Sequence, residues 1–306
     1  MTVLCTLFSS AKAFEGHNKR SQYNALRNWR ALGLPVILLG NDPGTTEAAA
    51  LFDCLHIPDV KTTEYGTPLL DDMFEKARAA ATTSIISYIN ADILLPPSFC
   101  EATNAASERW QEFLMIGQRW DVDIKEELSF DAGWPERLET LRKEKGTLHS
   151  PWGMDYFAFP RKLDFTMPPF SIGRPGWDGW LVWTLAEQKI PLLNASRGVR
   201  ILHQNHEYHH VPSGSGQSYN GPEAEDNLRI YRQLAPNLDP VYASPYRATW
   251  AFDGKAIVRD ISLGRWHWYL RHQSNFRLFC KKLITALLGQ KNATALIQTI
   301  RRLRSE

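Results

Sequence analysis

A short acidic turn follows one of the most apolar runs of the chain. The segment 84–89 leads directly into Asn90-Ala91-Asp92, after which apolar residues resume. The carboxylate of Asp92 is an oxygen ligand of the kind that Mg²⁺ and Mn²⁺ prefer. A cation held there could clamp the oxygens of a diphosphate, with Asn90 on a ribose or bridging through water. Because Asn and Asp also occur in ordinary turns, this motif alone does not decide the function.

Two further segments carry reactive side chains. Asp178, in Trp177-Asp178-Gly179-Trp180, opens a predicted helix that runs to about Gln188, where an acidic residue also serves as an ordinary N-cap. Downstream, four of the nine histidines lie within eight residues, between His203 and His210. This cluster is either a polar loop or a source of imidazole ligands, which suit Mn²⁺ better than Mg²⁺.

In this chain order, the segments resemble the GT-A glycosyltransferases over roughly residues 3–210. The acidic turn is similar to their Asp-X-Asp motif, with Asn90 in place of the first Asp. The helix start at Asp178 is similar to that of the inverting family 2 enzymes. The departure at Asn90 puts the metal dependence of the chain in question, and each motif taken singly has low specificity.

The resemblance implies an α/β fold of the GT-A (Rossmann-like nucleotide-diphospho-sugar transferase) type, a mixed sheet flanked by helices with a helical C-terminal appendage. It implies Asp178 as the general base toward an acceptor hydroxyl. It also implies a divalent metal, Mn²⁺ or Mg²⁺, held by Asp92 and His203, with His206 as the runner-up. The partners implied are a nucleotide-sugar donor, a UDP-sugar first, and a saccharide or lipid-linked acceptor.

Other residues match donor or acceptor positions of the family, although turn or capping roles compete for each. The donor-binding set is Ser9, Asn41, Asp42, Asp71, Asn90 and Asp92. The acceptor set is Asp155, Trp177 and Trp180. Indole faces commonly stack on sugars, but both tryptophans could equally belong to the core. Asp155 is included because a lone acid among aromatic residues in a strand is costly to bury unpaired.

The elements that position these residues alternate along the first hundred residues. Short apolar runs at 3–7, 35–39 and 84–89 read as strands, and helical spacing of apolar residues covers 21–32, 69–81 and 97–110. This alternation predicts a mostly parallel sheet with helices on both faces. In such sheets ligands bind beyond the carboxyl ends of the strands, where Ser9, Asn41 and Asn90 stand.

Strands are also predicted at 113–116 and 155–159, an extended run at 191–202, and helices at 135–145 and 222–234. We expect a catalytic domain over residues 1–261, with a donor half of about 1–118 and an acceptor half of about 119–261. Residues 262–306 form a basic, aromatic, helical C-terminal region.

Charge is distributed unevenly along the chain. The last 42 residues, from Arg265, carry nine Lys or Arg and one acid, which leaves 26 basic and 32 acidic residues before them. The basic tail predicts contact with an anionic membrane surface or packing onto the domain. An acidic body without a recognised nucleic-acid motif argues against nucleic acid as a partner. Four scattered cysteines and the lack of a long apolar run favour a cytoplasmic protein, peripheral to the membrane at most.

Two alternatives stay open from the sequence. One is a nucleotidyltransferase that makes a nucleotide sugar, although the segment 9–16 lacks the Gly-rich basic loop typical of those enzymes. The other is a non-catalytic carbohydrate-binding protein on the same fold. The leading interpretation is an inverting glycosyltransferase of glycan or surface-polysaccharide synthesis.

Overall fold

The computed structural model describes residues 5–205, 220–234 and 243–263 of the 306-residue chain. Its centre is a mixed sheet in the order β12-β11-β9-β6-β8-β4-β1-β2-β3, with β5, β7 and β10 attached beside that path. The strands are β1 (Cys5–Ser10), β2 (Val36–Leu39), β3 (Leu55–Ile57), β4 (Ile85–Ile89), β5 (Ile93–Leu94), β6 (Leu114–Val122), β7 (Thr147–Leu148), β8 (Met154–Pro160), β9 (Leu192–Asn194), β10 (Ile201–Gln204), β11 (Trp250–Phe252) and β12 (Ile257–Arg259).

The strands β1, β2, β3 and β4 are parallel, and β8 lies antiparallel between β4 and β6. Because β8 reverses direction, β6 again runs the same way as β4. We call the side where β1, β2, β4 and β6 end the carboxyl edge, and the side where they begin the amino edge. The start of β8 therefore lies at the carboxyl edge.

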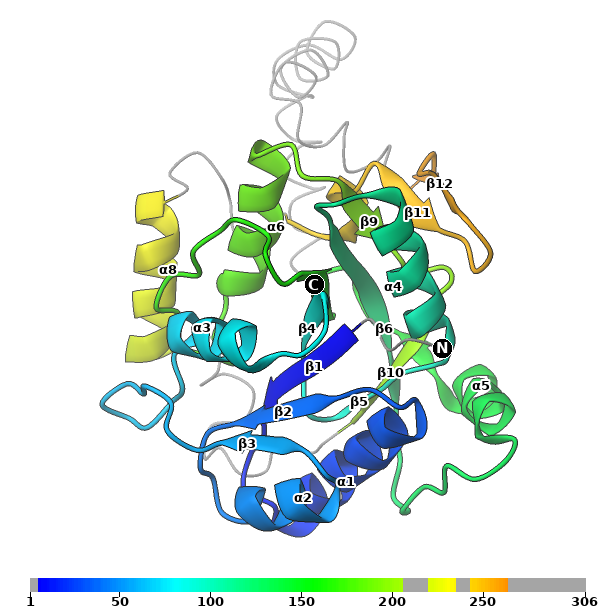
Figure 1. Ribbon diagram of the computed structural model, residues 1–306, viewed down its shortest axis with the longest axis horizontal. Helices are drawn as coiled ribbons and strands as arrows, with labels where there is room; N and C mark the ends of the chain where they lie inside the picture. Colours follow the sequence, from blue (N-terminus) through cyan, green and yellow to red (C-terminus); the bar gives the residue numbers. More distant parts are fainter. Residues whose placement is uncertain (1–4, 206–219, 235–242, 264–306) are drawn as a thin grey trace, which may run out of the picture. The chain divides into compact units, whose positions relative to one another are not determined.

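Helices cover both faces of this sheet. They are α1 (Gly16–Ala31), α2 (Thr45–Leu51), α3 (Leu70–Ala80), α4 (Ser98–Arg109), α5 (Trp134–Lys145), α6 (Trp177–Glu187) and α8 (Pro222–Leu234), with a short 3-10 helix, η2 (Pro245–Arg247). One apolar core joins the sheet to α1, α2 and α4, and a second joins it to α3, α6 and α8. Figure 1 shows these two groups of helices on opposite sides of the strands. The predicted α/β mixed sheet flanked by helices is confirmed.

Strand alternation explains how one sheet serves two cores. In β4, Ile85 and Ile89 belong to the core with α1 and α4, while Ile86 and Tyr88 belong to the core with α3 and α6. Successive side chains of a strand point to opposite faces, so a strand buried on both sides reads as a continuous apolar run. This is why the apolar runs predicted the buried strands well.

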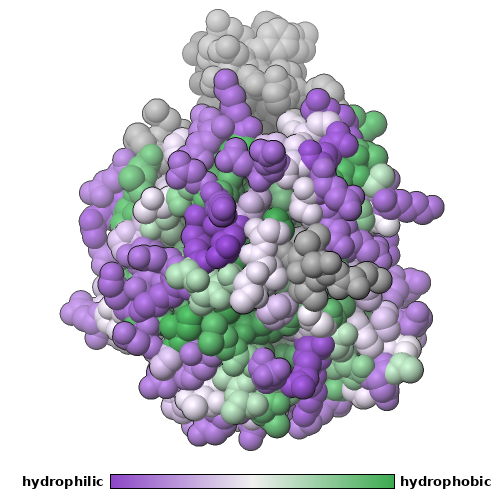
Figure 2. Space-filling view, viewed as in Figure 1, coloured by the Kyte–Doolittle hydropathy of each residue, from purple (hydrophilic) through white to green (hydrophobic). Residues whose placement is uncertain are grey.

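The remaining differences concern short elements and edges. The structure divides the expected extended run 191–202 into β9 and β10, and it adds α2, β3, β5, β7, β11 and β12, which the sequence did not indicate. Leu51 and Leu55, near the β3 edge, stay exposed. In the view of Figure 2 hydrophilic residues cover most of the surface, and apolar residues gather in its lower half.

The chain divides into two compact units, one ending at Asp260 and one beginning at Ile261. Nearly all described residues belong to the first unit. The predicted halves of the catalytic domain and the predicted helical C-terminal region stay predictions, since residues 264–306 lie outside the described residues. Within the described ranges, no helix has the length and apolarity needed to cross a bilayer.

Candidate functional site

Polar side chains from β8, β10 and the turn after β4 meet at the carboxyl edge. Asn90 and Asp92 follow β4, Asp155 lies near the start of β8, and His203 lies on β10. A bulge at Gly117 interrupts the pairing of β6 with β8, and the second half of β6 pairs with β10 instead. A Cβ at this position would lie 2.5 Å from the hydroxyl of Tyr156, so glycine permits the close approach.

Asp92 and His203 lie next to each other because β5 and β10 are antiparallel neighbours. His203 pairs with Ile93, the residue after Asp92, and its Nε2 lies 3.5 Å from Oδ2 of Asp92. His203 is buried, with a relative exposure of 6%. Burial alone would lower the pKa of His203, but the charges and hydrogen bonds of Asp92 and Asp121 outweigh it and raise that pKa to about 10. Two acids thus surround one imidazole.

Asp121, on β6, is a central residue of the site that the sequence did not single out. Its Oδ1 lies 3.1 Å from Nδ1 of His203, and its Oδ2 lies 2.6 Å from Nδ1 of His149. Arg119 donates to Oδ1 of the same carboxylate at 2.9 Å. Burial would raise the pKa of Asp121, but these three partners hold it well below its usual range. An aspartate before a loop gives no local signal of such contacts. The role of Asp121 becomes visible only when β6 is seen to pair with β10.

A second group of contacts centres on Asp155. Arg119 donates through Nη1 to both carboxylate oxygens, at 3.1 and 3.0 Å. Asn90 donates through Nδ2 to Oδ1 at 2.6 Å, and Oδ1 of Asn90 accepts from the hydroxyl of Tyr88 at 2.7 Å. Asp155 is 4% exposed, so this buried acid is fully paired. Both of its oxygens are held by protein groups, and the predicted contact of Asp155 with an acceptor stays a prediction.

Asp178 lies in the first turn of α6, above the same strands. Gly176, immediately before the helix, has a φ of +106°, a backbone conformation that favours glycine and that turns the chain into α6. Burial raises the pKa of Asp178 to about 6, and the charge of Asp155 adds to the rise against three backbone N–H groups. A carboxyl group titrating near neutrality is suited to take a proton from a hydroxyl.

The phenol of Tyr88 lies between the two parts of the site. Its ring packs edge-to-face on Trp177, with centroids 5.0 Å apart, and its hydroxyl bonds Asn90. Burial first, and then the charges of Asp155, Asp92 and Asp178, raise the pKa of this hydroxyl. All three carboxylates therefore act electrostatically on one buried hydroxyl, and the contacts of Tyr88 with Trp177 and Asn90 connect the helix start to the acidic turn.

The two tryptophans predicted to contact an acceptor pack in the core, and their contact with an acceptor stays a prediction. Trp177 packs against Tyr88 and Phe157, and Trp180 packs against Phe170. Their relative exposures are 7% and 6%, which leaves little indole face for a sugar. They hold α6 on the sheet instead, because large aromatic side chains contribute most when their faces are covered.

The candidate nucleoside residues have different surroundings. Ser9 is fully buried and donates to the carbonyl of Ile89 at 2.6 Å, so its hydroxyl fixes the end of β4. Asn41 is exposed after β2, and partial burial raises the pKa of Asp42. Asp71, in the first turn of α3, has a buried Oδ1 without a hydrogen-bond partner among the described residues. Nucleoside contacts of Ser9, Asn41, Asp42 and Asp71 stay predictions.

The residues present fit a divalent cation in one respect. Nε2 of His203 faces a carboxylate oxygen of Asp92, while its Nδ1 is bound by Asp121, which is the usual outer partner of a metal-bound histidine. No three His, Cys, Asp or Glu side chains among residues 5–205, 220–234 and 243–263 converge as a complete set. Two protein ligands suit Mg²⁺ or Mn²⁺ when substrate phosphates supply further oxygens. The runner-up His206 lies outside the described residues.

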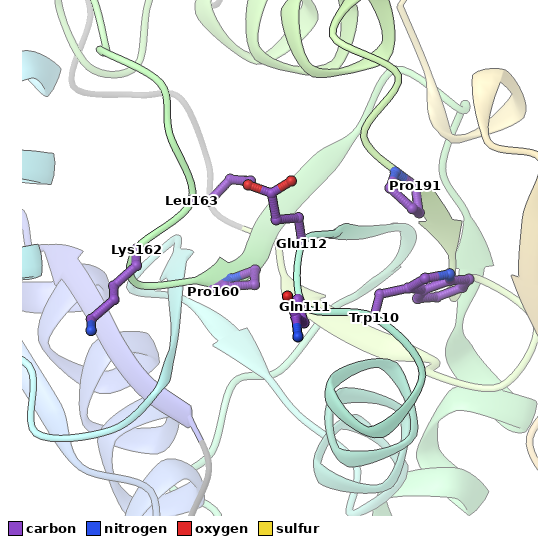
Figure 3. Close-up of a pocket in the computed structure, with 7 residues that line it drawn as sticks. All are labelled: Trp110, Gln111, Glu112, Pro160, Lys162, Leu163 and Pro191. Carbon is purple, nitrogen blue, oxygen red and sulfur yellow. The ribbon is translucent and has the colours of Figure 1, made fainter.

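A cavity of about 410 Å³ lies at the other side of the sheet, near the amino edge. It is lined by Trp110, Gln111, Glu112, Pro160, Lys162, Leu163 and Pro191. Figure 3 shows the charged ends of Glu112 and Lys162 directed apart. The hollow therefore lacks the converging acids and imidazoles found at the carboxyl edge.

No family model matches the sequence, and no curated protein matches it. Among solved structures, the chain is similar to glucosyl-3-phosphoglycerate synthase from Mycobacterium tuberculosis with Mg²⁺ and UDP, at 16% identity over 78% of this chain and 81% of that chain, with a TM-score of 0.45. The same enzyme with Mn²⁺, UDP-glucose and phosphoglyceric acid matches at 15% identity over 78% of this chain and 81% of that chain, with a TM-score of 0.43. A mycobacterial protein matches at 16% identity over 78% of this chain and 76% of that chain, with a TM-score of 0.46.

Proposed function

We propose that the chain is a glycosyltransferase of the GT-A type that transfers a sugar from a nucleotide-sugar donor, a UDP-sugar first, to a hydroxyl of a saccharide or lipid-linked acceptor. The observation that carries this proposal is that Tyr88 contacts the start of α6 through Trp177 and bonds Asn90 of the acidic turn, while both Asp178 and Asp92 act electrostatically on its hydroxyl. The helix start holds an acid whose pKa is raised to about 6, and the turn holds Asp92, which faces His203. Acid–base chemistry at a hydroxyl and binding of a diphosphate are the two needs of this reaction.

The chain's own residues suggest the course of the reaction. Asp178 takes the proton of the acceptor hydroxyl while the hydroxyl oxygen attacks the anomeric carbon and the bond to the diphosphate oxygen breaks. Asp92 and His203 would hold Mn²⁺ or Mg²⁺, which when bound neutralises charge on the diphosphate. Asp121 orients the imidazole of His203 through Nδ1. A single displacement of this kind inverts the anomeric carbon.

The purified protein tests this proposal directly. A panel of nucleotide sugars with Mn²⁺ should contain at least one compound that raises the thermal midpoint and is slowly hydrolysed. NMR of the product with an accepted alcohol should show inversion. Binding without turnover of any donor would indicate a non-catalytic carbohydrate-binding protein, and release of pyrophosphate from a nucleoside triphosphate and a sugar phosphate would indicate a nucleotidyltransferase.

A peripheral membrane location is proposed from the sequence alone. The segment 265–288 interleaves five Lys or Arg with aromatic and aliphatic residues and lies outside the described residues. Each such cation is worth about 1 kcal/mol near an anionic surface. Full-length protein should float with anionic liposomes at low salt, and protein ending near Ser262 should not. Failure of both to float would leave the segment a packing or oligomerising element.

A further inference from the structure

The amide of Asn90 has a partner on each side. Its Nδ2 donates to Oδ1 of Asp155 at 2.6 Å, and its Oδ1 accepts from the hydroxyl of Tyr88 at 2.7 Å. Its backbone N–H also donates to the carbonyl of Asp155 at 3.0 Å. The orientation of the amide is determined, because only its NH₂ group can face a carboxylate. The hydroxyl of Tyr88 must then donate.

An amide fills both roles at this position without any change of protonation. A carboxylate at position 90 could accept from Tyr88, but it would face the oxygen of Asp155 as a second acceptor. Asp155 is buried, and Arg119 donates to both of its oxygens. Two carboxylates in such contact cannot both ionise without a large cost. The Asn at the first place of the acidic turn is thus matched to its neighbour on β8.

We propose that Asn90 is a positioning residue that requires an amide, and that Asp155 supplies from β8 the acid that the turn lacks at its first place. The pair connects two groups of contacts. On one side Tyr88 bonds Asn90 and packs on Trp177, next to Asp178. On the other side Arg119 joins Asp155 to Asp121, which binds His203.

This inference makes a counterintuitive prediction. Asn90→Asp restores an Asp-X-Asp sequence, yet it should lower the thermal midpoint by about 4 °C or more, since a buried like-charge contact is created. For the folded enzyme we expect kcat to fall about tenfold or more with a much smaller change in donor KM, because reacting groups are displaced. The catalytic part rests on the proposed function. Mn²⁺ affinity, followed by electron paramagnetic resonance without donor, should not increase.

A double-mutant cycle isolates the contact. In Asp155→Asn alone, the NH₂ group of the new amide faces either the NH₂ group of Asn90 or the guanidinium of Arg119, and in both cases two donors are in contact. In the swap Asn90→Asp with Asp155→Asn, the new amide at 155 can donate to position 90 and accept from Arg119. The loss in thermal midpoint of the double variant should therefore be less than half of the sum of the two single losses. Asn104→Asp on α4, away from the site, is the matched control and should change neither midpoint nor kcat.

The outcomes separate this inference from the proposed function. Additive losses in the cycle would overturn the pairing of Asn90 with Asp155. Tighter Mn²⁺ binding or faster transfer by Asn90→Asp would show that position 90 is an ordinary metal position. A wild type that turns over no nucleotide sugar would instead contradict the proposed function, while the thermal cycle would still report on the pair.

Discussion

The carboxyl and amino edges of the central sheet differ in what they offer a ligand. At the carboxyl edge, acids and imidazoles from β4, β6, β8 and β10 are buried or half-buried and are bonded to one another. Near the amino edge, the cavity of Figure 3 is open, and its two charged residues, Glu112 and Lys162, are exposed. The cavity and the cluster of acids and imidazoles therefore lie at opposite edges of the sheet.

This difference favours the clustered ionisable groups, rather than the cavity, as the mark of the functional site. Buried ionisable groups cost free energy unless they are paired, so a fold that gathers several at one edge has a reason beyond stability. An open cavity whose charged side chains are exposed carries no such cost in free energy. The perturbed pKa values of Asp178, Asp121 and His203 all belong to the carboxyl edge. Variants at the two edges test this contrast.

The largest effect is expected for Asp92→Ala. Loss of the carboxylate that faces Nε2 of His203 should abolish transfer and weaken donor binding in the presence of Mn²⁺, while the fold survives. Calorimetry with a matching donor and circular dichroism measure the two effects. Asp164→Ala, an exposed acid beside the amino-edge cavity, is the matched control. Unchanged donor affinity and turnover in Asp92→Ala would remove the metal assignment.

Asp178→Asn should have the next largest effect. If Asp178 is the base, turnover falls about a hundredfold or more, and donor affinity changes little. The pH dependence gives a second readout. Because the pKa of Asp178 is raised to about 6, the ionised base is lost as pH falls through that value, so wild-type kcat should decrease below it. The residual activity of the variant should lack this inflection, and retention of configuration would contradict a direct displacement.

A smaller loss is expected for Asp121→Asn. The amide keeps the shape of the carboxylate but pairs less well with His203, His149 and Arg119, so we expect Mn²⁺ affinity to fall about tenfold, the low end for an outer partner of a ligand. Titration by electron paramagnetic resonance measures this affinity without catalysis. Asp123→Asn, an exposed neighbour, should leave it unchanged. Equal affinities for wild type and Asp121→Asn would make Asp121 a purely structural residue.

The smallest effect is expected at the amino edge. Glu112→Gln with Lys162→Ala removes both charged residues of the cavity, and we expect kcat and donor KM to stay within about twofold of wild type, as for ordinary surface substitutions. Steady-state kinetics with the accepted donor measure both constants. A loss of tenfold or more would place part of the substrate at this edge and end the contrast between the two.

The sequence by itself determined the elements and the order of the chemistry along the chain. Apolar runs and helical spacing predicted β2, β4, α3 and α8 closely, because buried strands and amphipathic helices carry their pattern locally. The acidic turn after β4 and Asp178 at the head of α6 were likewise visible, since turns and helix starts are defined by neighbouring residues.

The contacts of these residues follow from the folded arrangement of the strands. Asp121 and His203 stand 82 positions apart and meet because β6 bends at Gly117 to pair with β10. The tryptophans beside Asp178 became core, and Asp155 became the partner of Asn90 rather than a free acid. Such outcomes depend on strand order and on which groups share the interior, and no local pattern encodes them, because a buried polar group is defined by its distant partners.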